Sequence, residues 1–309
     1  MTITRDDINE SRQRIGPHVR VTPVMDVEAG ALGDHPALNL KLEFTQKSGS
    51  FKARGAFNTL LSKTVPAAGV AAASGGNHGA AVALAAADLG IPARIFVPEI
   101  ASAAKIARIE ATGATIMVEG ARYADALAHC EAFVDQTGAM GIHAYDAPET
   151  LAGQGTLAAE WLEQAPALDT LIVSVGGGGL IGGIGAWVRR SKRLVAVESG
   201  GTPALHEALE AGRPVDVEVS GIAGDSLGAR RIGALPFETL KGCDLVSVLV
   251  DDAAIREAQK VLWDQLRLPS EPGTAAALAA LLSGRYRPAR DERMGILLCG
   301  ANGAVADFS

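Results

Sequence analysis

Short apolar segments alternate with helical segments over most of this chain, and this alternation limits the possible folds more than any other feature. The predicted strands lie at residues 38–43, 69–73, 93–97, 114–118, 141–145, 170–175, 194–198, 245–250 and 295–299. The predicted helices lie at residues 5–16, 51–61, 80–89, 103–112, 123–136, 157–164, 180–190, 203–211, 253–266 and 274–282, and residues 215–235 are predicted as mostly loop. Short strands that alternate with helices form parallel sheets, so the order predicts an α/β fold.

The size and charge of the chain exclude several classes of protein. At 309 residues it can bury the core of one large or two moderate domains. Its net charge of −7 argues against a surface for nucleic acid. The N-terminus lacks an apolar secretion signal, and no apolar run is long enough to cross a membrane. Because Cys130, Cys243 and Cys299 form no CxxC pair, we expect a cytoplasmic protein without a disulfide framework.

Lys52 lies just after a predicted strand, at the start of a predicted helix. Ser50 is the expected N-cap, because its hydroxyl can accept hydrogen bonds from N–H groups that the first turn leaves unpaired. Lys52 then lies in the first turn, where the helix dipole disfavours a cation. Such a lysine is either solvated or has a lowered pKa, which suits attack on a carbonyl group. For this segment alone, a solvated lysine is the better interpretation.

Four consecutive glycines at 176–179 connect a predicted strand to a predicted helix. Ligands of open parallel sheets bind beyond the carboxyl ends of the strands. Without side chains, the backbone N–H groups can approach a phosphate at the helix N-terminus. A tight packing turn is the alternative that needs no ligand. Gly177, Gly179 and Gly182 also match a dinucleotide pattern in which Glu198 could contact a ribose, but this match lies in the middle of the chain.

Three further loops carry polar side chains, and each has a plain structural explanation. Ser74 or Asn77 could cap the helix that follows, and His78 alone is better explained as a packed histidine. Glu271 fits an ordinary acidic first turn of a helix. Cys299, considered by itself, is better explained as a buried small side chain. The six histidines are dispersed and show no zinc-binding spacing.

Taken together, these loops resemble those of one enzyme family. The matching motifs are Ser50-Phe51-Lys52-x-Arg54-Gly55-Ala56, Ser74 to Gly79, the glycines at 176–179, Glu271-Pro272-Gly273 and Cys299-Gly300-x-Asn302. Their order and spacing resemble the serine/threonine dehydratase family of pyridoxal-phosphate enzymes, which includes serine racemase. The resemblance implies fold type II, as in tryptophan synthase β, with mostly parallel twisted sheets in two domains. It places a small α/β domain at 63–142 within a large domain of 1–62 and 143–309, and it implies pyridoxal 5′-phosphate and a homodimer.

The resemblance also implies a role for each matched position. Lys52 would hold the cofactor covalently and then act as acid and base at the substrate α-carbon. Phe51 would pack against the cofactor ring, Asn77 would hydrogen-bond its 3′-oxygen, and Cys299 would face its pyridine nitrogen. The phosphate would bind the backbone of Gly176, Gly177, Gly178 and Gly179. The substrate carboxylate would bind the loop of Ser74, Gly75, Gly76, Asn77 and His78.

The chain departs from the family pattern in three places. Racemases of the family carry a serine at the position of Gly75, where it acts on the opposite face of the α-carbon. We therefore expect dehydration without efficient racemisation. The family's cation site uses two acids, and Glu198 matches the first, but Ala204 stands at the second, so no metal is predicted. Because the chain ends soon after the last motif, we expect no isoleucine-binding regulatory domain.

The resemblance implies a lyase that converts threonine or serine, as small β-hydroxy amino acids, to a 2-keto acid and ammonia. Alternatives within the family are a hydroxyaspartate dehydratase, a phenylserine dehydratase or a serine racemase. More distant alternatives are an NAD-dependent oxidoreductase and a binding protein without catalysis. The oxidoreductase would leave Lys52, Asn77 and Cys299 without a function, and binding alone would not require an amine at Lys52.

Overall fold

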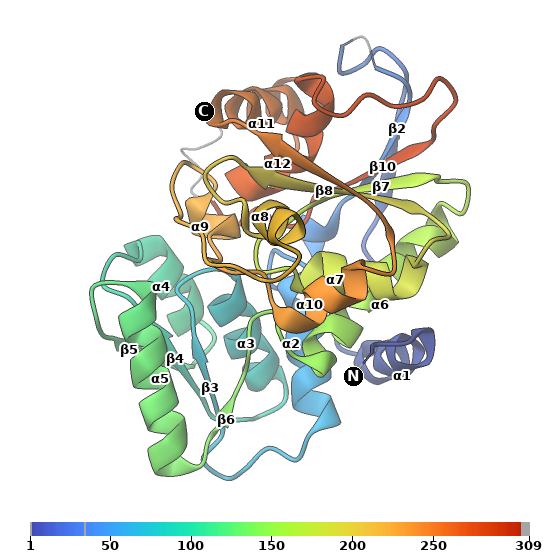
Figure 1. Ribbon diagram of the computed structural model, residues 1–309. Helices are drawn as coiled ribbons and strands as arrows, with labels where there is room; N and C mark the ends of the chain where they lie inside the picture. Colours follow the sequence, from blue (N-terminus) through green and yellow to red (C-terminus); the bar gives the residue numbers. More distant parts are fainter. Residues whose placement is uncertain (1, 34, 304–309) are drawn as a thin grey trace.

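The computed structural model describes residues 2–33 and 35–303, which form two sheets with helices on their faces (Figure 1). The larger sheet has the strand order β1-β2-β10-β7-β8-β9. Its strands are β1 (Val24–Val27), β2 (Leu38–Lys41), β10 (Met294–Leu297), β7 (Thr170–Ser174), β8 (Arg193–Ser199) and β9 (Asp244–Val250). The β1 strand pairs antiparallel with β2, and the other pairs of this sheet are parallel.

The smaller sheet consists of four parallel strands in the order β5-β4-β3-β6. Its strands are β3 (Val70–Ala73), β4 (Ala93–Val97), β5 (Thr115–Val118) and β6 (Met140–Gly141). All four lie within residues 63–142, the segment expected to form an inserted domain, although the domain boundaries themselves stay a prediction. The two sheets confirm the α/β class that the alternation of strands and helices predicts.

Helices pack on both faces of the larger sheet (Figure 1). The helices are α1 (Arg5–Ile15), α2 (Lys52–Ser62), α3 (Asn77–Asp88), α4 (Ala103–Glu110), α5 (Tyr123–Thr137), α6 (Pro148–Gln164), α7 (Gly179–Val188), α8 (Ala204–Ala211), α9 (Gly224–Leu227), α10 (Ala234–Leu240), α11 (Asp252–Leu266) and α12 (Pro272–Leu282), with a 3₁₀ turn at Glu43–Thr45. Within the described residues, none of these helices is long and apolar enough to cross a membrane.

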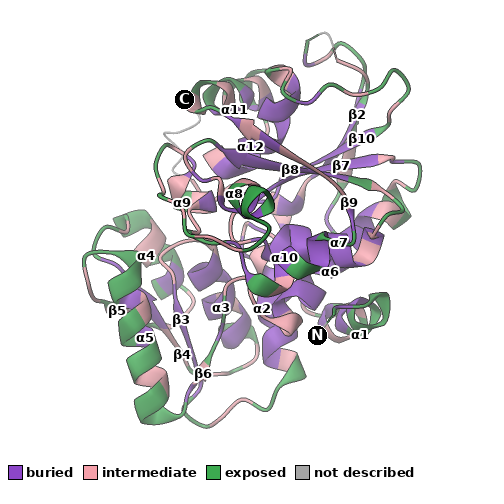
Figure 2. Cartoon of the chain, viewed as in Figure 1, coloured by how far each residue is buried: buried purple, intermediate pink, exposed green. Residues whose placement is uncertain are grey.

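The β7 strand shows how the core is divided between the two faces. Ile172 packs in one cluster with Leu278 of α12, whereas Leu171 and Val173 pack in another with Leu157 of α6. Successive residues of a strand point to opposite faces, so a strand covered on both sides is apolar throughout. Figure 2 shows the strands of this sheet largely buried, with the exposed residues mostly on the outer faces of the helices.

Helix α6 begins at Pro148, well before the start predicted at residue 157. Glycines weaken a helical pattern in sequence, but here they allow close packing. A Cβ atom at Gly153 would lie 2.7 Å from the carbonyl oxygen of Arg54, and one at Gly155 would lie 2.6 Å from Cδ1 of Ile8. The two glycines therefore let α6 approach α2 and α1 closely.

Other predictions of secondary structure were wrong in identifiable ways. The strand predicted at 141–145 is reduced to the short β6, because the chain turns at His143. The Nδ1 atom of His143 accepts hydrogen bonds from the backbone N–H groups of Tyr145 and Asp146, at 3.2 and 2.8 Å. The loop predicted at 215–235 contains α9 and the start of α10, and β1 was not predicted at all.

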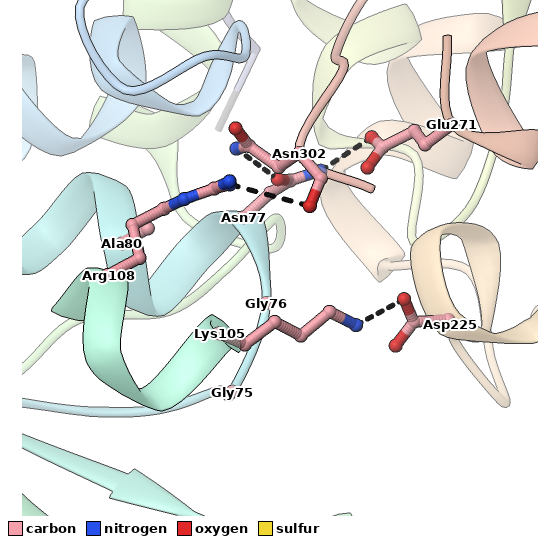
Figure 3. Close-up of a pocket in the computed structure, with 9 residues that line it drawn as sticks. All are labelled: Gly75, Gly76, Asn77, Ala80, Lys105, Arg108, Asp225, Glu271 and Asn302. Carbon is pink, nitrogen blue, oxygen red and sulfur yellow. Dashed lines mark hydrogen bonds and ion pairs between the residues drawn. The ribbon is translucent and has the colours of Figure 1, made fainter. Parts of the chain in front are cut away.

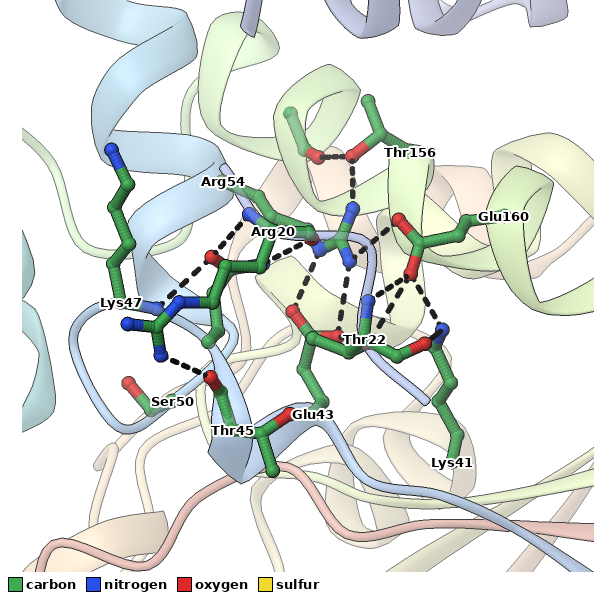
Figure 4. A network of polar contacts seen from close by, with 12 residues as sticks. Arg20, Thr22, Lys41, Glu43, Thr45, Lys47, Ser50, Arg54, Thr156 and Glu160 are labelled. Carbon is green, nitrogen blue, oxygen red and sulfur yellow. Dashed lines mark hydrogen bonds and ion pairs between the residues drawn. The ribbon is translucent and has the colours of Figure 1, made fainter. Parts of the chain in front are cut away.

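Arg54 connects α2 to α6 through buried ion pairs (Figure 4). Its guanidinium donates to Oε1 of Glu43 at 2.7 Å and to Oε2 of Glu160 at 3.0 Å. Lys41 donates to Oε1 of Glu160 at 2.6 Å, and the hydroxyl of Thr22 donates to Glu43 at 2.7 Å. All five side chains are buried, so loss of one partner would leave another charge uncompensated.

We expect Glu160→Ala to lower the free energy of unfolding by about 3–5 kcal/mol, because Arg54 and Lys41 lose a buried counter-ion. Glu163→Ala in the same helix is the control, since its ion pair with Arg12 is exposed and should contribute at most about 1 kcal/mol. Urea denaturation followed by circular dichroism measures both variants. Equal losses of stability would contradict a special role for the buried network.

Candidate active site

One cavity of about 60 Å³ gathers the end of β7 and the starts of α2, α3, α7 and α12. It is lined by Phe51, Lys52, Asn77, Tyr145, Ser174, Val175, Gly176, Gly177, Gly178, Gly179, Leu180, Ile181, Ser226, Leu227, Glu271, Gly273 and Cys299, and we call it the inner cavity. Every position expected to bind the cofactor lies on its wall. The resemblance thus selected residues from distant parts of the chain that the fold brings together.

Lys52 is the first residue of α2 and so lies in its first turn, as the sequence predicts. Its Nζ donates to the carbonyl oxygen of Ala144 at 2.8 Å and lies 5.0 Å from the ring centroid of Phe51. Burial lowers the pKa of Lys52 to about 8, although a nearby Cys299 acts in the opposite direction. Desolvation is therefore the main cause of this lowering. With this pKa about a tenth of the amine is neutral at pH 7, far more than for an ordinary lysine.

The prediction that Ser50 caps α2 is wrong. The N-cap is Phe51, no side chain caps this helix, and the buried hydroxyl of Ser50 has no hydrogen-bond partner. Ser50 instead forms an antiparallel β-bridge with Gly300, and the N–H of Phe51 donates to the carbonyl oxygen of Cys299 at 3.0 Å. Backbone pairing with the segment after β10, rather than a cap, positions the start of α2.

The four glycines at 176–179 leave no room for side chains. A Cβ atom at Gly177 would lie 2.3 Å from the ring of Tyr145, and one at Gly178 would lie 2.4 Å from Cδ1 of Ile232. Gly178 also has a φ of 90°, a backbone conformation that residues with a side chain rarely adopt. Helix α7 begins at Gly179, so its N-terminus faces the inner cavity and favours an anion there.

The donors and the unpartnered atoms of the inner cavity fit pyridoxal phosphate. Ser174 ends β7 two residues before the first of the four glycines, and its buried hydroxyl has no hydrogen-bond partner within the described chain. A phosphate next to the N-terminus of α7 would supply acceptors for this hydroxyl and for the backbone N–H groups. Lys52 supplies an amine with a lowered pKa at the same cavity.

Cys299 lines the inner cavity as a neutral thiol. Burial raises its pKa to about 12, and the nearby carboxylate of Glu271 acts in the same direction. Its Sγ lies 3.2 Å from Oγ1 of Thr274, which donates to the carbonyl oxygen of Gly300 at 2.7 Å. The thiol is thus held in place by a side chain that is itself fully hydrogen-bonded.

Asn77 is held by two partners that lie far away in the sequence. Its Nδ2 donates to Oε1 of Glu271 at 2.6 Å, and its Oδ1 accepts from Nδ2 of Asn302 at 2.6 Å. Asn302 also donates to the carbonyl oxygen of Ser48 at 2.9 Å. Burial raises the pKa of Glu271 to about 7. The carboxyl of Glu271 therefore positions Asn77, which is more than the ordinary first-turn acid suggested by the sequence.

A second, smaller pocket shares Asn77 and Glu271 with the inner cavity. It has a volume of about 20 Å³ and is lined by Gly75, Gly76, Asn77, Ala80, Lys105, Arg108, Asp225, Glu271 and Asn302 (Figure 3), and we call it the outer pocket. Asn77 and Glu271 therefore lie where the two spaces adjoin. The outer pocket includes part of the loop expected to bind the substrate carboxylate.

The rest of this loop has specific local contacts. The hydroxyl of Ser74 accepts from the backbone N–H of Gly76 at 3.1 Å. His78 is buried and its Nε2 lies 3.0 Å from the carbonyl oxygen of Ile142, while burial lowers its pKa to about 3. His78 is not on the wall of either pocket, so its role in substrate binding stays a prediction that this geometry does not support.

Sequence reasoning missed several residues of the inner cavity, including Tyr145, Ser174 and Leu227. The position of Ser174, two residues before the first of the four glycines, was a usable signal. Tyr145 and Leu227 gave none, because they reach the cavity only through loops that fold against the glycines. A Cβ atom at Gly176 would lie 3.1 Å from the backbone of Leu227.

Glu198 is buried at the end of β8, and the acid Glu207 lies close enough to act on it electrostatically. The Glu198 carboxylate accepts from the backbone N–H groups of Leu205 and His206, at 2.7 and 2.8 Å, in the first turn of α8. Burial raises its pKa to about 8. Among the described residues, no group of three or more His, Cys, Asp or Glu side chains could hold a metal ion.

Comparisons with known proteins identify relatives along nearly the whole chain. Residues 15–300 match the family model described as pyridoxal-phosphate dependent enzyme. The phenylserine dehydratase of Ralstonia pickettii is 38% identical over 305 residues, which cover 96% of this chain and 93% of the relative. The L-threonine ammonia-lyase of Thermotoga maritima is 32% identical, covering 97% of this chain and 76% of the relative.

Among solved structures, maize serine racemase is similar over 99% of this chain and 95% of its own, with 34% identity and a TM-score of 0.92. The match of the family model and the similarity to these relatives agree with the geometry of the inner cavity. The chain therefore belongs to the pyridoxal-phosphate dependent enzyme family, has the fold of its type II members and uses pyridoxal 5′-phosphate as its cofactor.

Proposed function

We propose that this enzyme is a dehydratase that converts L-threonine or L-serine to a 2-keto acid and ammonia. In this reaction the α-proton and the β-hydroxyl leave as water, and hydrolysis then consumes one water, so the net products are the keto acid and ammonia. The similarity to ammonia-lyases and dehydratases supports a lyase. The arrangement around Gly75 supports elimination over racemisation.

Different residues of the inner cavity would contact different groups of the cofactor. Lys52 would bind it covalently, the glycines at 176–179 would hold its phosphate, and Asn77 would contact its 3′-oxygen. Phe51 would pack against its ring, and Cys299 would face its pyridine nitrogen. Pyridoxal phosphate, when bound, supplies the electron sink that makes the α-proton of an amino acid removable.

Lys52 is the residue that moves the α-proton in this proposal. Its lowered pKa provides a neutral amine near neutral pH, and only the neutral amine can accept a proton. The hydrogen bond to the carbonyl oxygen of Ala144 gives the amine a fixed direction. A neutral base on one face of the substrate is sufficient for elimination.

Gly75 is the single observation that carries the choice between elimination and racemisation. Racemisation by two bases needs a proton donor on the second face, and Gly75 has no side chain to supply one. A Cβ atom at this position would lie 2.9 Å from both Cγ1 of Val97 and the Cβ of Ala101. A serine here would therefore crowd Val97 and Ala101, which supports the proposal that this position supplies no second proton donor.

Phenylserine is a second candidate substrate, and two observations favour it. The relative with 38% identity is named as a phenylserine dehydratase. The rings of Phe51 and Tyr145 line the inner cavity and could contact an aryl group. Threonine and phenylserine differ only in the group on the β-carbon, so both fit the same chemistry.

The first test combines the visible spectrum with turnover. We expect the purified holoenzyme to be yellow and to release a keto acid from threonine, serine or phenylserine. Lys52→Ala should lose the yellow band and at least about a thousandfold in kcat, because it removes both the attachment point and the base. A colourless protein that binds NAD would overturn the proposal. Lys47→Ala, at a neighbouring lysine outside the inner cavity, is the control.

The second test concerns the face of the substrate at Gly75. Chiral chromatography should detect no steady formation of D-serine from L-serine. Gly75→Ser should lower the free energy of unfolding by about 1–3 kcal/mol through crowding, and adding Val97→Ala should restore part of it. Sustained D-serine formation by the wild-type enzyme would contradict the assignment.

The third test concerns the thiol of Cys299. A neutral thiol does not enforce a charged pyridine ring, which limits delocalisation of negative charge and favours elimination over transamination. Cys299→Asp should raise the amount of the amine form of the cofactor that accumulates per turnover, measured by chromatography after denaturation. Cys299→Ser is the conservative control. Unchanged partitioning in Cys299→Asp would count against this role.

A further inference from the structure

The outer pocket adjoins the inner cavity, in which the cofactor and the substrate are proposed to bind. The two spaces share Asn77 and Glu271 as walls, and Gly75 and Gly76 line the outer pocket. A substrate whose carboxylate binds the 74–78 loop therefore lies at the boundary between the two. The charges of the outer pocket then act on the substituent at the β-carbon of the substrate.

Two cations from α4 face the outer pocket, and each has a partner on the opposite side (Figure 3). Lys105 forms an ion pair with Asp225 of α9. Arg108, one turn further along α4, donates from Nη1 to the carbonyl oxygen of Asn302 at 3.4 Å. The side chain of Lys105 is 23% exposed, so its charge is only partly screened by water.

We propose that Asp225 determines substrate specificity by charge, neutralising Lys105 so that the outer pocket rejects a substrate with a side-chain carboxylate. The preferred substrates would then be β-hydroxy amino acids with an uncharged side chain, and 3-hydroxyaspartate would be excluded. This inference rests on the proposed dehydratase function.

The charges around the outer pocket explain why Asp225 controls this choice. A second carboxylate on the substrate would have to compete with Asp225 for Lys105, and it would also meet the acid Glu271. Asp225 raises the pKa of Glu271 and Lys105 lowers it. The charges of the Lys105–Asp225 ion pair therefore act on Glu271, which lines both the outer pocket and the inner cavity. Removal of Asp225 would leave Lys105 without this counter-ion, and an anion would then meet the charge of Lys105 in addition to that of Arg108.

The test measures binding of succinate and butyrate to the holoenzyme by isothermal titration calorimetry. Both acids have four carbons, but only succinate carries a second carboxylate. We expect Asp225→Asn to tighten succinate binding relative to butyrate by about fivefold, which corresponds to about 1 kcal/mol. Lys105→Gln should weaken succinate relative to butyrate by a similar factor, because Asp225 then lacks its counter-ion.

The two substitutions are expected to change the ratio of succinate to butyrate affinity in opposite directions. This distinguishes selection by charge from a purely structural role of the ion pair. Both substitutions break the same ion pair, so a pair that only holds α4 and α9 together would change the binding ratio in the same direction. Asp216→Asn is the control, because Asp216 pairs with Arg231 outside both pockets and is similarly exposed. Asp225→Ala provides a second removal of the charge.

The inference fails if Asp225→Asn leaves the ratio of succinate to butyrate affinity unchanged, or if Asp216→Asn shifts it equally. In kinetics, Asp225→Asn should raise kcat/KM for 3-hydroxyaspartate relative to threonine by a similar factor. Succinate and butyrate bind without turnover. Failure of the holoenzyme to eliminate water from any substrate would therefore refute the proposed function while leaving the binding ratios as a separate result.

Discussion

The buried ion pairs of Arg54 are an interaction on which the position of Lys52 depends. Arg54 lies two residues after Lys52, and its guanidinium is fixed between Glu43 and Glu160. A guanidinium with carboxylates on two sides has few alternative positions once water is excluded. The first turn of α2, and with it Lys52, is therefore held by these buried charges as well as by the backbone pairing with the segment after β10.

Close approach between backbones is the second constraint, and it explains the glycine-rich composition. Gly153 brings α6 against α2, and a Cβ atom at Gly183 would lie 2.4 Å from the carbonyl oxygen of Leu151, so α7 is equally close to α6. Because these helices pack so closely, their first residues have little room to move. The glycines at 176–179 thus belong to one layer of close contacts that extends from the cavity into the core.

Much of the fold could be predicted from the sequence, because the alternation of short apolar and helical segments repeats from residue 69 to the end. Local hydrogen bonding could not be predicted, since Ser50 looks like a helix cap but pairs through its backbone with Gly300. The partners of Asn77 lie 194 and 225 residues away, so no local pattern could reveal them. The resemblance to a family selected positions that line the inner cavity, whereas Tyr145 and Leu227 could be placed there only from the folded chain.

Glu198 has a consequence for how the folded chain responds to pH. Its pKa lies near 8 in the folded state, against an ordinary value of 4.5, because burial outweighs the two backbone hydrogen bonds. The folded protein therefore holds a proton that the unfolded chain gives up above about pH 4.5. Unfolding in the window between these two values releases this proton, so this residue makes the fold progressively less stable as the solution becomes alkaline. The buried carboxyl of Glu198 at the end of β8 thus retains one proton in this window for as long as the protein stays folded.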